Sequence, residues 1–230
     1  MYDIVYILKA NASPRELRYS LRSVEENMNI RKVWFYCGKP EGLEPDEYVA
    51  HKQEGSTKWE RVRSSLIKIC ENDDITKKFW LFNDDFYVLQ PFKRAKAFHR
   101  GLIQDHVKVI QRKYGPNGSQ YSRNLEDCDD QLYRAGLTTL DYTLHIPMLV
   151  ERSKMLEALK MFPNCPMFRS LYGNYAKVGG DYHDDVKVAE PRDKVDESLD
   201  FLSSNDNSIM GEVGKFLAER FPNPSRFEVR

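Results

Sequence analysis

Residues 79–86 read FWLFNDDF, a short apolar run that changes abruptly into three polar residues, Asn83, Asp84 and Asp85. Four consecutive apolar residues are typical of a strand that is buried on both faces. Two adjacent carboxylates directly after such a strand are poorly placed for solubility alone. The boundary therefore predicts a buried strand that ends either at a functional edge or at an ordinary turn, in which Asn and Asp are common.

Strand and helix patterns alternate on the N-terminal side of this boundary. Residues 3–8 (DIVYIL) and 32–37 (KVWFYC) predict buried strands, and a shorter strand is predicted at 48–53. Apolar residues at helical spacing predict helices over 14–28 and 59–70. This order predicts an α/β fold with a mostly parallel, doubly wound sheet. Ligands of such sheets bind outside the carboxyl ends of the strands, where Asp84 and Asp85 fall.

The remainder of the chain is more polar and less regular. A helix near 95–112 and a long loop are expected first. The later predictions are a strand at 141–150, a helix at 153–161, a turn-rich aromatic segment at 169–177 and a C-terminal helix at 206–220. We expect one domain over residues 1–230, with halves at 1–92 and 93–230.

Composition limits the classes of function. The 35 basic and 35 acidic side chains give a formal net charge of zero, so no global positive field attracts nucleic acid, although a local basic groove stays possible. The four cysteines are widely separated and form no CxxC pair, which favours reduced thiols. The first residues lack the pattern of a secretory signal. We therefore expect a cytoplasmic protein that does not insert into a membrane.

Asp84 and Asp85 are the sharpest local signal. Hard cations such as Mg²⁺ take carboxylate oxygens and complete their shell with substrate phosphate oxygens. A cation at this position would neutralise charge on a nucleotide leaving group. On the motif alone, a metal site and a plain turn are equally well supported.

His145 lies inside an apolar segment, Leu144-His145-Ile146-Pro147. A neutral imidazole at a strand end is suited to act as a general base on a hydroxyl. The alternative is a hydrogen-bonded core histidine, which is the more common use of such a residue.

Three further groups could meet a nucleotide. Arg169 could contact phosphate, while Tyr172 and Asn174 could hold a sugar or a base; the alternative is a packed surface loop. His183 lies in an acidic cluster at 181–185 that could complete a metal site or be solvated. The basic residues near predicted strand ends or helix starts, where a diphosphate would bind, are Lys9, Arg18 and Lys58.

Several segments resemble one protein family. Residues 16–25, ELRYSLRSVE, resemble the ELRYSLRS-type block of the Stealth proteins, which are sugar-1-phosphate transferases related to nucleotide-sugar glycosyltransferases of the GT-A type. Residues 3–6 resemble the strand that opens the family's first block, and 82–86 resemble its NDD block. Residues 145–148, followed by Arg169, resemble its third block. The matches occur in the family's order over most of residues 1–170.

The resemblance implies a metal-dependent transferase with a GT-A-like fold, in which 1–92 bind the nucleotide-sugar and 93–230 face the acceptor. The expected catalytic residues are His145, Asp85 and Arg169. Together with the local patterns described above, the expected nucleotide-binding residues are Lys9, Arg18, Lys58, Asn83, Asp84, Tyr172 and Asn174; the segment that carries the last two is not a general feature of the family. Mg²⁺ or Mn²⁺ would bind at Asp84, Asp85 and His183.

The chain also departs from the family, since its first strand continues into Ile7-Leu8-Lys9-Ala10-Asn11 instead of a Trp-Val-Asn/Asp-Gly loop. Its compact layout resembles glycosyltransferase-like proteins of bacteriophages. We therefore predict sugar transfer from a UDP-sugar to a hydroxyl of a saccharide, a small molecule or a modified DNA base, for which 93–96 and 111–114 could line a local groove. The alternatives are sugar-1-phosphate transfer, a metal-dependent phosphodiesterase or nuclease, and a non-catalytic binding protein.

Overall fold

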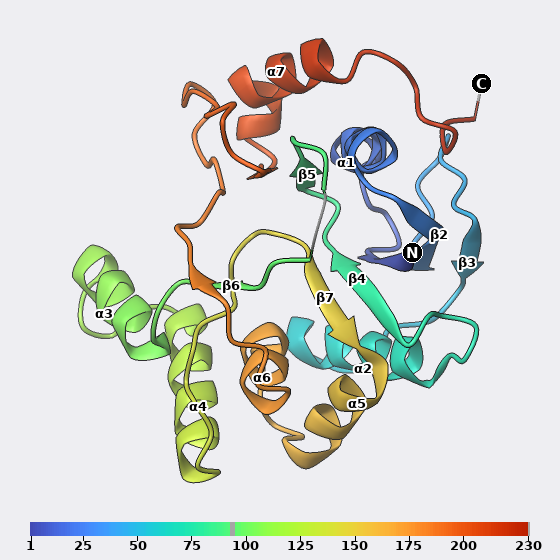
Figure 1. The fold of residues 1–230 in the computed structure, drawn as a ribbon. Coiled ribbons are helices and arrows are strands. Elements are labelled where there is room, and N and C mark those ends of the chain that lie inside the picture. Colours follow the sequence, from blue (N-terminus) through green and yellow to red (C-terminus); the bar gives the residue numbers. More distant parts are fainter. Residues whose placement is uncertain (93–94, 230) are drawn as a thin grey trace.

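A five-stranded sheet forms the centre of the α/β domain in this computed structural model, which describes residues 1–92 and 95–229 (Figure 1). The strand order is β3-β2-β1-β4-β7. The parallel strands are β1 (Tyr2–Leu8), β2 (Ile30–Cys37), β3 (Glu47–Val49) and β4 (Lys78–Phe82), and β7 (Met148–Glu151) runs antiparallel to β4. The predicted mostly parallel sheet within one α/β domain is confirmed.

Alternating side chains of the strands build one core on each face of the sheet. Ile4 and Tyr6 of β1 pack with Leu17 and Leu21 of α1 (Pro14–Asn27) on one face. Val5 points to the other face, which is covered by α2 (Lys58–Glu71) and α5 (Arg152–Met161). Figure 1 shows α1 above the sheet and α2 and α5 below it. The period-2 pattern of the strands thus gives a sheet that is buried on both faces.

The predicted helices at 14–28, 59–70 and 153–161 are confirmed to within about two residues, the usual accuracy of a helix boundary. Local signals explain where they begin. Ser13 caps α1 ahead of Pro14 at the first turn, and Thr57 forms a capping box with Glu60 at the start of α2. The starts of α1 and α2 lie at the carboxyl edge of the parallel strands, because each helix follows a strand.

Two small sheets and further helices surround the central sheet. One small sheet pairs β5 (Phe86–Val88) with β9 (Phe201–Ser203), and the other pairs β6 (Phe98–His99) with β8 (Asp181–Tyr182). The remaining helices are α3 (Ile103–Tyr114), α4 (Gln120–Arg134), α6 (Phe168–Tyr175), the short 3-10 helix η1 (Ser208–Met210) and α7 (Glu212–Arg220). Because β5 pairs with β9, the C-terminal part of the chain returns to the strand that follows Asp85.

Several predicted elements after residue 92 are wrong. The expected long loop contains α4, whose Leu125, Cys128 and Leu132 are buried at helical spacing. The segment at 169–177 is mostly the helix α6, since it buries Phe168 and Leu171. The helix expected near 95–112 begins only at residue 103, since 98–99 form β6, and the C-terminal helix is divided into η1 and α7. The short strands β5, β6, β8 and β9 were not predicted, and before residue 92 the strand expected at 48–53 covers only 47–49.

The predicted strand at 141–150 is also wrong in its first part, because regular pairing begins only at Met148. The backbone of 141–147 is held by side chains instead. Thr143 N donates to Asp141 Oδ1 and His145 N donates to Asp185 Oδ1. The chain therefore reaches the sheet as an irregular loop that carries His145.

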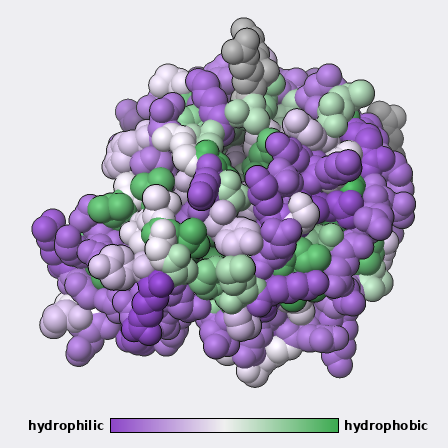
Figure 2. Space-filling model, turned by 60° about the horizontal axis from the view of Figure 1, so that its bottom comes forward, coloured by the Kyte–Doolittle hydropathy of each residue, from purple (hydrophilic) through white to green (hydrophobic). Residues whose placement is uncertain are grey.

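Within the described residues, no helix is long and apolar enough to cross a membrane. Figure 2 brings the lower side of Figure 1 forward, and its surface is mostly hydrophilic. Apolar side chains gather there in small patches that polar side chains separate. Over the part of the chain that the structure describes, this face therefore offers no broad apolar docking surface.

Candidate functional site

Segments that are distant in the sequence meet at the carboxyl edge of the sheet. Lys9 follows β1 and Asn83-Asp84-Asp85 follows β4. Because β7 runs antiparallel to β4, with Leu81 opposite Met148, the residues before β7 lie beside those after β4. The structure thus brings His145 to the edge that carries the two aspartates.

Asp85 is held by partners from the C-terminal part of the chain. Its Oδ2 accepts hydrogen bonds from Lys187 Nζ at 3.0 Å and from Ser203 Oγ at 3.4 Å. The backbone N–H of Ser204 donates to the Asp85 carbonyl at 3.3 Å. The orientation of this carboxylate is therefore fixed by the strand β9 and by the segment that contains Lys187.

Asp84 lies in an unfavourable environment for a negative charge. Burial raises its pKa, the neighbouring charge of Asp85 raises it further, and Asp206 adds to this effect. The positive charge of Lys9 opposes them. A cation beside Asp84 would relieve the repulsion between these carboxylates.

A third carboxylate, Glu16, approaches from the first turn of α1. It is buried, and its Oε1 accepts a hydrogen bond from Ser204 Oγ at 2.6 Å. Burial raises the pKa of Glu16; the Ser204 hydrogen bond lowers it, and the charges of Asp84 and Asp85 raise it. Within residues 1–92 and 95–229, however, no three His, Cys, Asp or Glu side chains are gathered into a ready cation site.

His145 forms a close pair with Asp185. Its Nδ1 lies 2.8 Å from Asp185 Oδ2, and its backbone N–H donates to Oδ1 of the same carboxylate at 3.1 Å. Arg100 Nη1 lies 3.6 Å from Asp185 Oδ2. Burial alone would raise the pKa of Asp185, but the hydrogen bonds and charges of these two neighbours lower it to about 2. The carboxylate therefore accepts the Nδ1 proton and directs the Nε2 lone pair away from itself.

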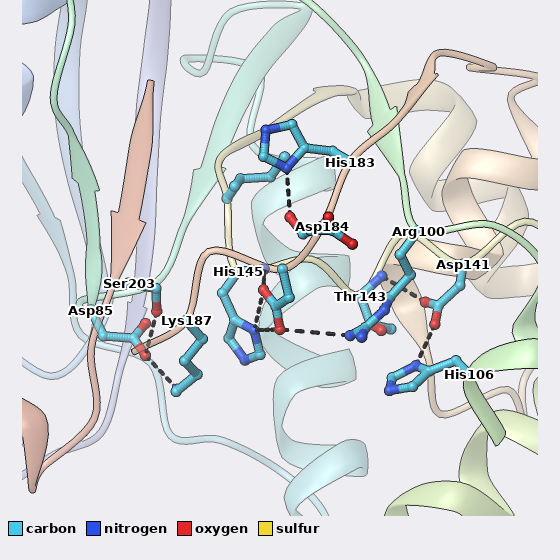
Figure 3. A network of polar contacts seen from close by, with 12 residues as sticks. Asp85, Arg100, His106, Asp141, Thr143, His145, His183, Asp184, Lys187 and Ser203 are labelled. Atoms are coloured by element: carbon cyan, nitrogen blue, oxygen red, sulfur yellow. Dashed lines mark hydrogen bonds and ion pairs between the residues drawn. The ribbon is translucent and has the colours of Figure 1, made fainter. Parts of the chain in front are cut away.

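A second histidine–aspartate pair supports the loop that carries His145. His106 Nδ1 lies 2.6 Å from Asp141 Oδ2, and Asp141 Oδ1 accepts the Thr143 N–H at 2.8 Å. The backbone N–H of Arg100 also donates to the Asp141 carbonyl, at 2.9 Å. Figure 3 shows the Asp85–Lys187 contact on one side of His145 and the residues Arg100, Asp141 and His106 on the other. Polar contacts thus extend across the whole candidate site.

Arg169 contacts the same loop and the end of β4. Its Nη1 donates to the Ile146 carbonyl at 2.7 Å, its Nη2 donates to the Leu81 carbonyl at 3.3 Å, and its guanidinium lies 5.1 Å from the Phe86 ring centre. Burial lowers the pKa of Arg169 to about 10, although the charge of Asp85 opposes this effect. Two of its donors are thus used to join the end of β4 to the His145 loop.

Arg169 also lines a pocket with a volume of about 250 Å³. Ile146, Pro147, Phe98 and Tyr142 contribute apolar and aromatic walls. The pocket therefore adjoins the His145 loop and combines an apolar lining with a cationic group, as small-molecule sites commonly do.

The structure gives other predicted site residues different contacts. The Asn174 side chain is buried and bonds to Ser170 and to the 138–140 segment. The Tyr172 hydroxyl accepts a hydrogen bond from the backbone N–H of Glu151 at 2.8 Å. His183 packs against Phe98 and bonds to the carbonyl of the next residue. The binding roles predicted for Tyr172, Asn174 and His183 stay predictions.

Of the three basic residues predicted to bind the diphosphate, one lies near the acidic pair and two make other contacts. Lys9 lies close enough to Asp84 for its charge to affect the pKa of that group. Arg18 instead pairs with Glu228 at 3.0 Å, and Lys58 lies over the ring of Trp59 at 5.4 Å, at the start of α2. The described interactions therefore connect Lys9, and neither of the other two, to the acidic pair.

The sequence analysis included Asp185 only as a member of the acidic cluster at 181–185, and it missed Lys187. The acidic cluster at 181–185 is visible in the sequence, but residue type alone favours His183 within it as the site residue. The usable signal is the alternation Asp185-Val186-Lys187, because an apolar residue between two charged residues indicates an extended segment with one polar face. No comparable signal marks Arg100 or Ser203.

Comparison with models of known protein families found no match to this chain, and a search of curated proteins also found none. The resemblance to the Stealth proteins therefore stays a prediction from the quoted segments.

Proposed function

We propose that this chain is a metal-dependent glycosyltransferase with a GT-A-like fold that transfers a sugar from a nucleotide-sugar to an acceptor hydroxyl. The observation that carries the proposal is the meeting of the Asp84–Asp85 pair with the His145–Asp185 pair at one edge of the sheet. This combination supplies one group of side chains for the diphosphate of a donor and another for the proton of an acceptor.

The His145–Asp185 pair is suited to general base catalysis. Asp185 accepts a hydrogen bond from the Nδ1–H of His145. The unprotonated Nε2 is therefore the nitrogen that accepts the proton of the acceptor hydroxyl. The carboxylate also stabilises the imidazolium that forms, because its low pKa keeps it charged. The deprotonated oxygen then attacks the anomeric carbon of the donor sugar, and the bond from that carbon to the diphosphate breaks.

Asp84 and Asp85 fit a divalent cation such as Mg²⁺ or Mn²⁺. Mg²⁺ commonly uses one or two carboxylates together with substrate phosphate oxygens, so it needs no larger cluster of protein ligands. The cation, when bound, would neutralise charge on the leaving diphosphate. Lys9 contributes a further positive charge near Asp84, which is appropriate for orienting an anionic donor.

The acceptor is proposed to enter through the pocket of about 250 Å³ beside the His145 loop. The proposed acceptors are those predicted from the sequence, a saccharide, a small molecule or a modified DNA base. Lys96 lines this pocket, but Lys93 and Arg94, which were expected to contribute to a basic groove, lie outside the described residues. The predicted cytoplasmic location belongs to the same proposal.

The first experiment is a thermal-shift panel of nucleoside diphosphates and nucleotide-sugars, with and without Mn²⁺ or Mg²⁺. A ligand that binds the folded state raises the melting temperature by mass action. We expect a cation-dependent shift with UDP or a UDP-sugar, and its loss in Asp84→Ala. The matched control is Asp130→Ala, which changes an exposed aspartate that pairs with Arg134 within α4. No shift with any nucleotide would refute the proposal.

Product analysis separates the related reactions. Sugar transfer releases the nucleoside diphosphate, whereas sugar-1-phosphate transfer releases the nucleoside monophosphate. Cleavage of a nucleic-acid backbone without any nucleotide-sugar would instead identify a phosphodiesterase. We expect the diphosphate as the nucleotide product.

A further inference from the structure

Residues 183–188, here called the strap, cross the candidate site after β8. The strap is fixed on its C-terminal side by β9, because Ser203 N donates to the Val186 carbonyl at 3.3 Å and Val188 N donates to the Ser203 carbonyl at 2.9 Å. Lys187 forms a parallel bridge with Ser203. The backbone of this part of the strap is therefore extended and held in register with the strand that leads to Ser204.

The extended backbone explains why two strap side chains reach the site. Side chains alternate along an extended chain, so Asp185 and Lys187 share one face while Val186 points to the other. Val186 is buried in the core that contains α1. Asp185 meets His145, and Lys187 meets Asp85. One strap thus supplies a charged partner to the proposed base and another to the acidic pair.

The Lys187 ammonium lies where a cation is needed. Its Nζ is 3.0 Å from Asp85 Oδ2, and the two side chains are 27% and 14% exposed, so solvent screens the pair only in part. Asp85 is adjacent to Asp84, whose own charge is disfavoured by burial. In this arrangement Lys187 therefore performs part of the neutralisation that a divalent cation would provide.

We propose that Lys187 is an exchangeable counter-ion, which occupies Asp85 in the free protein and moves to the diphosphate of the donor when a divalent cation binds the aspartate pair. The proposal rests on the proposed function and adds to it a specific phosphate-binding residue. A flexible four-carbon stem that carries a compact charge suits such an exchange, since Lys binds phosphate as a mobile point charge. The cation and the lysine compete for Asp85 in the free protein and cooperate once the diphosphate is present.

The test compares Lys187→Met with the wild-type protein in two titrations. The first measures Mn²⁺ binding without nucleotide, from the electron paramagnetic resonance signal of free Mn²⁺. Because an uncharged thioether side chain cannot compete for Asp85, we expect the variant to bind Mn²⁺ about tenfold more tightly, the effect of one charge-assisted contact. The second measures UDP binding by calorimetry at saturating Mn²⁺. Here we expect the variant to bind about tenfold more weakly, since a phosphate contact is lost.

Two further variants make the result specific. Lys187→Arg keeps the positive charge and is expected to bind Mn²⁺ as the wild type does. If Lys187→Met folds poorly, Lys187→Gln also removes the charge and is expected to give the same two changes in affinity. Lys215→Met is the matched control, because Lys215 pairs with Glu212 at 2.7 Å on α7 and is expected to change neither titration. Circular dichroism confirms that each variant is folded.

The outcomes separate this inference from the proposed function. Unchanged or weaker Mn²⁺ binding in Lys187→Met would overturn the counter-ion role, whether or not a nucleotide binds. Unchanged UDP affinity in that variant, with a wild-type protein that does bind UDP, would overturn the phosphate-binding role alone. A wild-type protein that binds Mn²⁺ but no nucleotide would refute the glycosyltransferase proposal and, with it, the movement of Lys187 to a donor.

Discussion

Replacing Asp185 with Asn should reduce the stability of the protein by an amount that depends on pH. The structure lowers the pKa of Asp185 from 3.8 to about 2 through His145 and Arg100, although burial acts in the opposite direction. That difference corresponds to about 2 kcal/mol of folding free energy at neutral pH, since one pKa unit is worth about 1.4 kcal/mol. The Asp185 side chain is 21% exposed, so this value needs little reduction for solvent screening.

The sign of the pH dependence follows from the direction of the pKa shift. A carboxyl group whose pKa is lower in the folded state stabilises the protein fully above its unfolded pKa, near 3.8. This contribution is lost as the pH falls through the folded pKa of about 2. The free energy difference between wild type and Asp185→Asn should therefore be about 2 kcal/mol at pH 7 and about half of that at pH 3.

Urea denaturation at pH 7, 5 and 3 measures this difference directly. The matched control is Asp184→Asn, because Asp184 is the neighbouring, exposed carboxylate, whose Oδ1 accepts a hydrogen bond from the Tyr182 hydroxyl. We expect that control to stay within about 0.5 kcal/mol of the wild type at each pH. A difference for Asp185→Asn that is absent at pH 7, or that is equally large at pH 3, would refute the interpretation of Asp185 as a carboxylate that its partners hold in the charged form.

Three other predictions concern the site and its support. His145→Ala should keep cation-dependent nucleotide binding but slow transfer by about 10²–10⁴-fold, as measured from nucleotide release. A loss of nucleotide affinity as large as the loss of rate would contradict its role as base. Asn174→Ala should cost about 1–3 kcal/mol in urea denaturation, because it leaves the partly buried N–H and carbonyl of Leu140 without their partners; a stability equal to wild type would contradict this account. Gly173→Ala should destabilise the protein by about 1–3 kcal/mol, since a Cβ at this position would overlap the Tyr142 ring; a stability equal to wild type would show that the ring can move away.

The sequence is most informative where a local pattern and its burial agree. The strands before Asp84 are continuous apolar runs, and α1 and α2 begin at strong capping signals, so their place in the sheet could be predicted. The segment of α4 reads as polar because much of its surface is exposed, and a few buried apolar positions keep it in the core. Such a helix is stabilised by tertiary packing more than by its own composition.

The sequence could predict the main residues of the site but not the partners that hold them. Asp84, Asp85 and His145 are recognisable because each follows or precedes an apolar segment. Their partners Asp185 and Lys187 come from a segment about 40 and 100 residues away, and that pairing depends on how β9 fixes the strap. The sequence favours His183 over Asp185 because residue type is visible in it, whereas the direction of a side chain on an extended segment is not.

The strap restricts the insertions and deletions that this protein can accept during evolution. Asp185 and Lys187 face the same way because one residue separates them, so a single inserted residue between them would place them on opposite faces. Either contact could then be kept only by losing the other. Substitutions can adjust the base and the acidic pair separately, but length changes in the strap affect both together. Related chains that keep the His145–Asp185 pair should therefore also keep the single residue between Asp185 and Lys187. A protease that cuts the strap would disrupt both contacts at once.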